Sequence, residues 1–387
     1  MGVSWFLARV LLATKYHLKY VIVSSDSENG FNFSEGTGLS EVLIVAKRQD
    51  KHSPDEETVF INLLRKPSTA LEAVALADEI MNKHVTLGGV ATAHVTRVKR
   101  SSLLNYILNW NTLANEWLFN YLDSMVRSSM VSIGNIIVKT PLTQLNTFID
   151  ANTVNRHNMA ETFNLIVHGN RVDCDAYRNK PNAPYVPMIC GGGEGVTNRM
   201  LIQPNAYVPD TNNDTAMRIK SLRSRFFLPY RIRWNTFHTI ALRSTEPAIS
   251  NVYFTVRTNL TEEQEKALIL WLNSFWGILT VFSFMEITVG AFTGLSIAQW
   301  RVLPVLNVRE LSEDAVKCLA NAFDKHVNTD FGRFPKQFER GTRMDMDIDV
   351  IKCLSTPISE EDVKALRSGL SELYAQFSTV LRQISGR

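Results

Sequence analysis

The spacing of apolar residues changes from helical to strand-like and back within the first part of the chain. Val3–Leu12 places its apolar side chains at helical intervals, and the polar, glycine-bearing segment Ser24–Gly38 is typical of a loop. Thr69–Met81 returns to helical spacing, with Glu72 in its first turn, where a carboxylate is favourable. Three short runs rich in β-branched residues predict strands between these helices: Tyr20–Val23, Leu39–Ala46 and Thr58–Leu64.

The middle of the chain mixes both patterns and is interrupted by turn-forming residues. Leu103–Leu122 carries enough Leu, Ile and Trp to be largely helical. Strand-like runs follow the alternating or β-branched pattern at His94–Val98, Met130–Val138, Phe237–Leu242 and Val252–Val256. Stretches rich in Gly, Pro, Asn and Asp predict turns or loops at Asn179–Pro187, Cys190–Gly195 and Pro204–Asp214.

Helix-start signals dominate the later part of the chain. Thr261-x-x-Gln264 is a capping box, which predicts a long apolar helix that continues to Met285. The stretch Ala267–Met285 contains no charge, but its polar residues and closely flanking charges favour a buried core helix over a membrane span. Ser312 and Ser359-x-x-Asp362 begin two further predicted helices.

The composition narrows the class of protein. A length of 387 residues is enough for two or three domains, and 45% hydrophobic with 20% charged residues excludes a disordered, collagen-like or miniprotein class. The net charge of +3 does not by itself indicate a nucleic-acid partner. Arg9 interrupts the apolar N-terminus, so we expect no signal peptide and no membrane association. The cysteines form no C-x-x-C pair, which predicts reduced thiols in a cytoplasmic protein and no zinc site: Cys174, Cys190, Cys318 and Cys353.

One segment concentrates positive charge and aromatic rings. Between Ala216 and Arg243 every charged residue is basic. Aromatic residues are interleaved with these charges: Phe226, Phe227, Tyr230, Trp234 and Phe237. Arginines neutralise DNA phosphates and can hydrogen-bond guanine, while aromatic rings can stack on an exposed base. The same pattern also fits a solvated face whose arginines extend over a core strand, and the sequence leaves both interpretations open.

Motifs that would provide a catalytic centre are weak in this sequence. The glycine run Cys190–Gly195 lacks the lysine of a P-loop, and Phe31–Gly38 only faintly resembles a glycine loop that binds S-adenosylmethionine. Asn182-Ala-Pro-Tyr185 is close to the NPPY signature of amino-group methyltransferases but lacks its first proline. The eight histidines show no metal-ligand spacing. We therefore expect no catalytic, cofactor-binding or metal-binding residue in this chain.

Segments along most of the chain carry a family resemblance. They are Tyr20–Asp26, Phe33–Arg48, Leu228–Thr236, Ala267–Ser274, Gln299–Leu306 and Arg343–Asp347. In this order they resemble the end of the catalytic domain, the target-recognition region and the tail of N6-adenine DNA methyltransferases from restriction-modification and phage-defence systems. The resemblance implies an α/β fold in which the terminal strands of a Rossmann-like sheet precede a mixed α/β target-recognition domain and C-terminal helices. The corresponding segments are 1–85, 86–306 and 307–387.

In that family the cofactor loop and the NPPY motif precede the strands with which this chain begins. Family catalytic residues therefore cannot be transferred to this chain, and S-adenosylmethionine is expected in a separate catalytic subunit. Two or three strands with one helix would leave an open sheet edge. We expect the partner interface at that edge, on Tyr20, Val21, Ile22 and Val23.

The resemblance implies a DNA target-recognition subunit of a split enzyme that methylates the exocyclic amine of adenine in duplex DNA. The target base must leave the stack to reach such a site. The predicted DNA contacts are Arg218, Lys220, Arg223, Arg225, Arg231, Arg233, Trp234, Asn235 and His238. Two alternatives remain open: a complete methyltransferase that uses Asn182–Tyr185, and a non-enzymatic remnant that binds DNA or protein.

Overall fold

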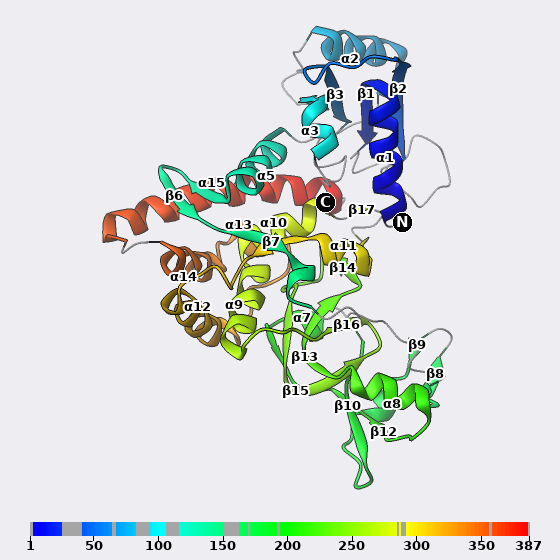
Figure 1. Ribbon diagram of the computed structural model, residues 1–387, viewed down its shortest axis with the longest axis vertical. Helices are drawn as coiled ribbons and strands as arrows, with labels where there is room; N and C mark the ends of the chain where they lie inside the picture. The colour runs from blue at the N-terminus through cyan, green and yellow to red at the C-terminus, as the bar shows by residue number, and fades with distance from the viewer. Residues whose placement is uncertain are drawn as a thin grey trace. The chain divides into compact units, whose positions relative to one another are not determined.

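A computed structural model describes most of the chain (Figure 1). The described residues are 3–24, 41–63, 67–82, 93–105, 116–149, 162–168, 171–191, 194–284, 286–287, 292–355 and 358–385. The chain divides into a first unit of Met1–Ser128, Phe282–Gln299 and Ala375–Arg387, and a second unit of Ser129–Val281 and Trp300–Tyr374. These bounds differ from the three predicted segments because residues distant in sequence pack into the same core. Helices and mixed sheets occur together, which confirms the predicted mixed α/β class.

A four-stranded sheet forms the core of the first unit (Figure 1). Its strands are β1 (Tyr16–Ser24), β2 (Val42–Arg48), β3 (Glu57–Leu63) and β4 (Ala93–Lys99), in the order β2-β1-β3-β4. β1 and β3 are parallel, and the other neighbours are antiparallel. The unit also contains α1 (Val3–Lys15), α2 (Ala70–Asn82), α3 (Arg100–Asn105), α5 (Glu116–Ser128) and the pair β17 (Glu286–Ile287) and β18 (Phe292–Gly294). The predicted strands and the helices Val3–Leu12 and Thr69–Met81 are therefore present. The predicted helix Leu103–Leu122 is helical in α3 and α5 at its two ends, whereas its residues 106–115 and residues 25–38 of the predicted loop lie outside the described residues.

β1 is a central strand, so the predicted partner interface on Tyr20, Val21, Ile22 and Val23 is wrong. These residues pair with Val42–Val45 of β2 on one side and with Val59–Asn62 of β3 on the other. A short apolar run is compatible with either an edge or a central strand, and only its neighbours in space decide which it is. In this sheet the edge strands are β2 and β4.

The two faces of this sheet are buried by different residues. On one face Leu76 of α2 packs in a cluster with Val59, Ile61 and Ala93 of the sheet. On the other face Val21 and Phe60, which are opposite each other in β1 and β3, are both 0% exposed. Burial on both faces explains why β1 and β3 are nearly continuous apolar runs in the sequence.

A larger mixed sheet forms much of the second unit. Its strands are β10 (Tyr185–Ile189), β11 (Leu201–Ile202), β12 (Ala206–Pro209), β13 (Ser224–Pro229), β15 (Leu242–Ser250) and β16 (Tyr253–Val256). Their order is β12-β10-β15-β13-β16, and β11 pairs with β15 in parallel. β13 therefore lies between two strands, and its Phe226, Phe227 and Leu228 are each 0% exposed.

Three predictions for this region are wrong in whole or in part. The predicted loop Asn179–Pro187 is irregular only as far as β10, which begins at Tyr185, and the predicted loop Pro204–Asp214 contains β12. The predicted strand Phe237–Leu242 is irregular until β15 begins at Leu242. Proline was the misleading signal, since Pro187 lies within β10 opposite Tyr207 of the edge strand β12. A proline removes only its own N–H donor, so the neighbouring residues still pair.

Short elements complete the second unit. β5 (Met130–Ile133) and β6 (Ile136–Lys139) form a hairpin in which Gly134 has a φ of +56°, so the predicted strand Met130–Val138 is a pair of strands. The other short strands are β7 (Leu142–Gln144), which pairs with β19 (Pro304–Leu306), β8 (Val167–His168), which pairs with β9 (Arg171–Val172), and β14 (Arg231–Arg233). Short helical elements are η1 (Leu145–Thr147), η2 (Asp175–Tyr177), α7 (Glu194–Thr197), α8 (Asp214–Ser221) and α13 (Lys336–Glu339).

Longer helices follow in the C-terminal part of the chain, as predicted. α9 (Glu262–Asn273) packs against α12 (Glu313–His326), and α12 packs against α14 (Met344–Leu354). α11 (Ile297–Val302) and α15 (Glu360–Ser385) each contribute residues to both units. The caps at Ser312 and Ser359 are confirmed, because the amides of Ala315 and Asp362 donate to the respective hydroxyls.

The predicted long apolar helix is two helices, α9 and α10 (Phe275–Ser283), which meet at a bend of 69°. The capping box is confirmed, since Thr261 and Gln264 each accept a hydrogen bond from the backbone amide of the other. Ser274 ends α9 in an extended conformation, and its hydroxyl accepts a hydrogen bond from the amide of Gly277. The bend therefore has its own cap, which the uninterrupted apolar pattern does not reveal.

The burial predicted for this segment is confirmed. Residues 267–284 are all buried, and Trp271 and Trp276 stack with ring centroids 6.0 Å apart. Among the described residues, no helix taken singly has the length and hydropathy needed to cross a membrane. Taken together as a bent pair, α9 and α10 are long and apolar enough to meet this requirement, which considers only length and composition.

Gly277 occupies a position where the bend needs glycine. A Cβ atom at Gly277 would lie 2.1 Å from the carbonyl oxygen of Trp271 and 2.6 Å from the Cα of Leu272. Gly277→Ala is therefore expected to lower the free energy of unfolding by about 1–3 kcal/mol, the usual cost of overpacking. Gly195→Ala in α7 is the matched control, because a Cβ there meets no atom within 4 Å. Urea unfolding checks the prediction, and equal stability of the two variants would contradict it.

All four cysteines form disulfides, so the predicted reduced thiols are wrong. Cys174 bonds to Cys190 and Cys318 bonds to Cys353, with Cα separations of 5.7 and 5.4 Å. Their separations along the chain, 16 and 35 residues, conceal this proximity. Cys318 and Cys353, for example, belong to α12 and α14, which pack against each other.

Candidate nucleic-acid interface

The exposed arginines of the basic segment lie at the two ends of β13. They are Arg218 on α8, Arg223 in the following turn, Arg225 on β13, and Arg231 and Arg233 on β14. We call these five residues the arginine cluster. The stretch Phe226–Pro229 between them is buried. The two ends of the cluster are therefore separated by the length of β13, about 20 Å at the usual rise per residue.

The aromatic residues of this segment belong to the core. Phe226 and Phe227 are 0% exposed, as is Trp234. Tyr230 is half-buried, and the guanidinium of Arg231 lies 5.4 Å from the centroid of its ring. The interleaving of arginine and aromatic residues thus arises because arginines face solvent while the rings face the interior, the second interpretation that the sequence left open.

Two of the predicted DNA contacts are interior residues. Trp234 is fully buried with its ring centroid 5.1 Å from that of Phe334, so its predicted role in stacking on a base is wrong. His238 is 4% exposed, and its Nδ1 lies 2.6 Å from Oδ1 of Asp330, so it is not placed to contact a base edge. Asn235 is half-buried, and its Oδ1 is a buried atom without a hydrogen-bond partner among the described residues. The DNA contact predicted for Asn235 stays a prediction.

Two basic residues of the segment are neutralised by carboxylates. The ammonium group of Lys220 lies 2.5 Å from Oδ1 of Asp210. The guanidinium of Arg243, which is 7% exposed, lies 3.0 Å from Glu262 and 2.5 Å from Glu265 at the start of α9. Positive charge that is paired in this way contributes less to an attraction for phosphates, so Lys220 and Arg243 are weaker candidates for DNA contacts than the exposed arginines of the cluster.

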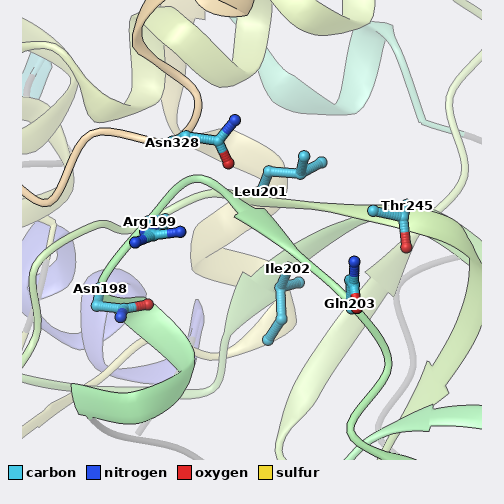
Figure 2. Close-up of a pocket in the computed structure, with 7 residues that line it drawn as sticks. All are labelled: Asn198, Arg199, Leu201, Ile202, Gln203, Thr245 and Asn328. Atoms are coloured by element: carbon cyan, nitrogen blue, oxygen red, sulfur yellow. The ribbon is translucent and has the colours of Figure 1, made fainter.

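A pocket of ≈ 390 Å³ opens beside the large sheet (Figure 2). It is lined by Asn198, Arg199, Leu201, Ile202, Gln203, Thr245 and Asn328. Figure 2 shows Gln203 and Thr245 next to each other on one side, and Asn198 and Arg199 together on the other. β11 carries Leu201 and Ile202 and runs parallel to β15, which brings Gln203 next to Thr245. The pocket is thus built from three separate segments of the second unit.

The polar side chains of the pocket form no hydrogen bond or salt bridge within the described residues, although the charge of Arg199 acts on Asp330. Within the part of the chain that the structure describes, Asn198, Arg199, Gln203, Thr245 and Asn328 make no side-chain hydrogen bond or salt bridge, and no carboxylate lines the pocket. The arginine cluster adjoins it, because the guanidinium of Arg225 donates to the carbonyl oxygen of Thr245. These residues could not be predicted from the sequence, because single amides in a weakly charged segment form no recognisable motif.

A carboxylate lies close to this pocket. Burial raises the pKa of Asp330, but the Gly332 amide, the hydrogen bond and charge of His238 and the charge of Arg199 outweigh it, so the net pKa lies below the ordinary value. The folded state therefore binds a proton on Asp330 less readily than the unfolded state does. This carboxylate contributes stability above the unfolded pKa of about 3.9, and the contribution is lost as the pH falls through the lower folded pKa.

Asp330→Asn removes this linkage. We expect the melting temperature of the native chain to fall more steeply than that of Asp330→Asn as the pH decreases below about 4. Because Asp330 is half-exposed, we expect only a small difference in melting temperature between the two proteins, with the native chain losing more as the pH falls. Thermal unfolding of both proteins across the acidic range measures it, and parallel curves would contradict the assignment.

The segments that came closest to a cofactor motif are an exposed bend and a glycine run that is only partly described. In the NPPY-like tetrapeptide, Asn182, Ala183 and Pro184 form an exposed bend and Tyr185 begins β10, and none of them lines the pocket. In the glycine run, Gly191 has a φ of +75°, as in a turn, while Gly192 and Gly193 lie outside the described residues. No group of three His, Cys, Asp or Glu side chains is arranged to hold a metal ion within the described ranges.

The chain is similar to solved structures but not to a family model or a curated sequence. No family model matches the chain, and no curated protein matches its sequence. A crystal structure described as that of the type IIG restriction endonuclease BpuSI is similar with a TM-score of 0.42 and 11% sequence identity. The match covers 99% of this chain and 45% of that chain, so this chain spans less than half of its length. At this TM-score and identity, the likeness does not indicate a function for this chain.

Proposed function

We propose that this chain binds duplex DNA as the target-recognition part of an S-adenosylmethionine-dependent N6-adenine DNA methyltransferase in a restriction-modification or phage-defence system. The observation that carries the proposal is the arginine cluster, five exposed guanidinium groups in a segment with no acidic residue, next to a pocket without carboxylates. Such an arrangement attracts the DNA backbone and leaves room for contacts to base edges.

The proposal assigns methyl transfer to another chain. The resemblance in the sequence provides the family, and the described residues that came closest to a cofactor motif form an exposed bend. In this assignment the present chain holds the duplex around the target adenine, and a catalytic subunit with a glycine loop and an NPPY motif binds S-adenosylmethionine. The surface that contacts this subunit is not β1, whose backbone is paired on both sides.

The test measures DNA binding and methyl transfer separately. Labelled methyl transfer from S-adenosylmethionine to duplex DNA is followed with this chain alone, with the product of the adjacent upstream gene alone, and with both. Transfer that appears or becomes sequence-specific only in the mixture, together with DNA binding by this chain, supports the proposal. Transfer by this chain alone would mean that it is a complete enzyme. DNA binding without transfer in any combination would leave a non-catalytic DNA-binding protein.

A further inference from the structure

The pocket beside β11 differs chemically from a phosphate site. A phosphate offers only acceptors and is usually held by several cations and backbone amides. The pocket instead has one cation, Arg199, and neutral groups that both donate and accept hydrogen bonds: Asn198, Gln203, Thr245 and Asn328. Base edges in the major groove also present both donors and acceptors.

The absence of protein partners for the polar side chains of the pocket, within the described part of the chain, also favours a ligand that both donates and accepts hydrogen bonds. Arg199, Gln203, Thr245 and Asn328 are exposed, and none of the five polar side chains forms a hydrogen bond or salt bridge with the described residues. Three amides and a guanidinium around a cavity of ≈ 390 Å³ are therefore open to solvent or to a ligand. Leu201 and Ile202 add an apolar surface to the lining. Amides that face a ligand together with aliphatic side chains provide both directional hydrogen bonds and contact area for a planar heterocycle.

The position of the pocket places it within reach of the same DNA as the arginine cluster. Arg225 belongs to that cluster, and its guanidinium donates a hydrogen bond to the backbone carbonyl oxygen of Thr245. Thr245 is also one of the residues that line the pocket. A duplex whose backbone is held by the cluster would therefore pass next to the pocket. We infer that this pocket is the site of base readout, in which Asn198, Arg199 and Gln203 hydrogen-bond the edges of bases in the bound DNA. This inference rests on the proposed DNA binding and adds the residues that determine specificity.

The residue types specify the expected base contacts. Asn and Gln side chains pair in a bidentate way with the N6 and N7 atoms of adenine, and Arg pairs with O6 and N7 of guanine. Aliphatic side chains such as Leu201 and Ile202 suit the methyl group of thymine. The pocket therefore predicts a recognition sequence that includes purines at the positions that it contacts.

The experiment selects bound duplexes from a library with a randomised centre and sequences them. The full-length chain is compared with Asn198→Ala, Gln203→Ala and Gln203→Glu, and with Asn321→Ala as a control. Asn321 is an exposed amide on α12 outside the pocket lining. We expect each alanine variant of the pocket to reduce the preference at one or two base positions about tenfold, the size of a lost bidentate contact. Gln203→Glu should change which base is preferred at the same position, because the carboxylate has lost the amide donors.

The outcomes separate this inference from the proposed function. If the native chain binds no duplex, the proposed function fails and base readout fails with it. If the native chain binds DNA but shows no sequence preference, or the pocket variants keep its preference, DNA binding stands and the base-readout inference is overturned. Uniformly weaker binding to all sequences would also overturn it, since that is the result expected for a phosphate contact. Melting temperatures and the altered preference of Gln203→Glu distinguish a lost contact from a misfolded variant.

Discussion

Asp347→Ala is expected to lower the free energy of unfolding by about 3–5 kcal/mol, the usual cost of leaving a buried charge without its partner. Asp347 is 0% exposed, and its Oδ2 lies 2.9 Å from Nε of Arg343, which is 1% exposed. Its Oδ1 accepts a hydrogen bond from the amide of Phe275, the first residue of α10. The substitution therefore leaves a buried guanidinium without its carboxylate and removes the acceptor at the start of α10.

Further groups depend on the same carboxylate. The hydroxyl of Tyr374 donates to Oδ2 of Asp347 at 2.5 Å, and burial, together with the negative charge of Asp347, holds the pKa of Tyr374 well above its ordinary value. Arg343 also donates to Gln337 and to the carbonyl oxygen of Asn273 at the end of α9. This network connects α14 and α15 to the bend between α9 and α10, so its loss should affect the core of the second unit.

Asp345→Ala is the matched control, since Asp345 is on the same helix and its partner Arg367 is exposed. A surface pair of this kind contributes at most about 1 kcal/mol. Urea unfolding followed by tryptophan fluorescence compares the two variants, and Asp347→Asn tests the role of charge while retaining one acceptor oxygen. If Asp347→Ala were no less stable than Asp345→Ala, the network would not have the structural role described here.

Elements whose signals are local could be predicted from the sequence. The capping box at Thr261 and the cap at Ser312 depend on residues three positions apart, so their hydrogen bonds follow from the sequence itself. The strand pattern of Thr58–Leu64 and the helical pattern of Thr69–Met81 likewise reappear as β3 and α2 within one residue at each end. Because such signals involve neighbours along the chain, no knowledge of the tertiary structure is needed to interpret them.

Features that depend on distant neighbours could not be predicted. β1 is central because β2 and β3 pair on either side of it, and the apolar run Tyr20–Val23 does not specify those partners. Cys318 and Cys353 are paired because α12 and α14 pack together. The bend at Ser274 is likewise held by Asp347, through a hydrogen bond that spans 72 residues of sequence. In each case the deciding contact is made by residues far away in the chain.

The candidate site likewise has one part that could be predicted from the local sequence and another that depends on the fold. The density of arginines in the basic segment is a property of the local sequence, and the five arginines of the cluster are exposed. The burial of Trp234 and His238 depends on Phe334 and Asp330, which the sequence does not place near them. The pocket combines residues near 200 with Thr245 and Asn328, so it becomes visible only when the fold is known.

Removing three positive charges from the arginine cluster is expected to weaken duplex binding by on the order of a hundredfold at about 0.1 M salt. The variant is Arg218→Gln, Arg223→Gln and Arg231→Gln in one chain. All three side chains are exposed, and none forms an ion pair among the described residues. Arg223 donates to the carbonyl oxygen of Lys220, and Arg231 lies over the ring of Tyr230, so both are held at the surface without being neutralised.

The control removes the same number of charges from a different surface. Lys317, Lys352 and Lys364 are exposed on α12, α14 and α15, and the control variant changes all three to Gln. The control variant has the same net charge as the cluster variant. An effect of net charge alone would therefore weaken the DNA binding of the two variants equally. We expect the control to bind duplex DNA within about threefold of the native chain, since lysines outside the contact surface release no counterions on binding.

The dependence of affinity on salt distinguishes a contact from a change in folding. Each phosphate neutralised contributes about −0.9 to the slope of log K against log salt, so the cluster variant should have a slope smaller by about 2–3 than that of the native chain. A destabilised protein with an intact interface would lose affinity without this change in slope. Unchanged affinity and slope in the cluster variant would show that DNA does not bind at the ends of β13. A reduced slope with unaltered base preference would instead assign these arginines to the phosphates and leave sequence discrimination to other residues, because backbone contacts weaken all sequences alike.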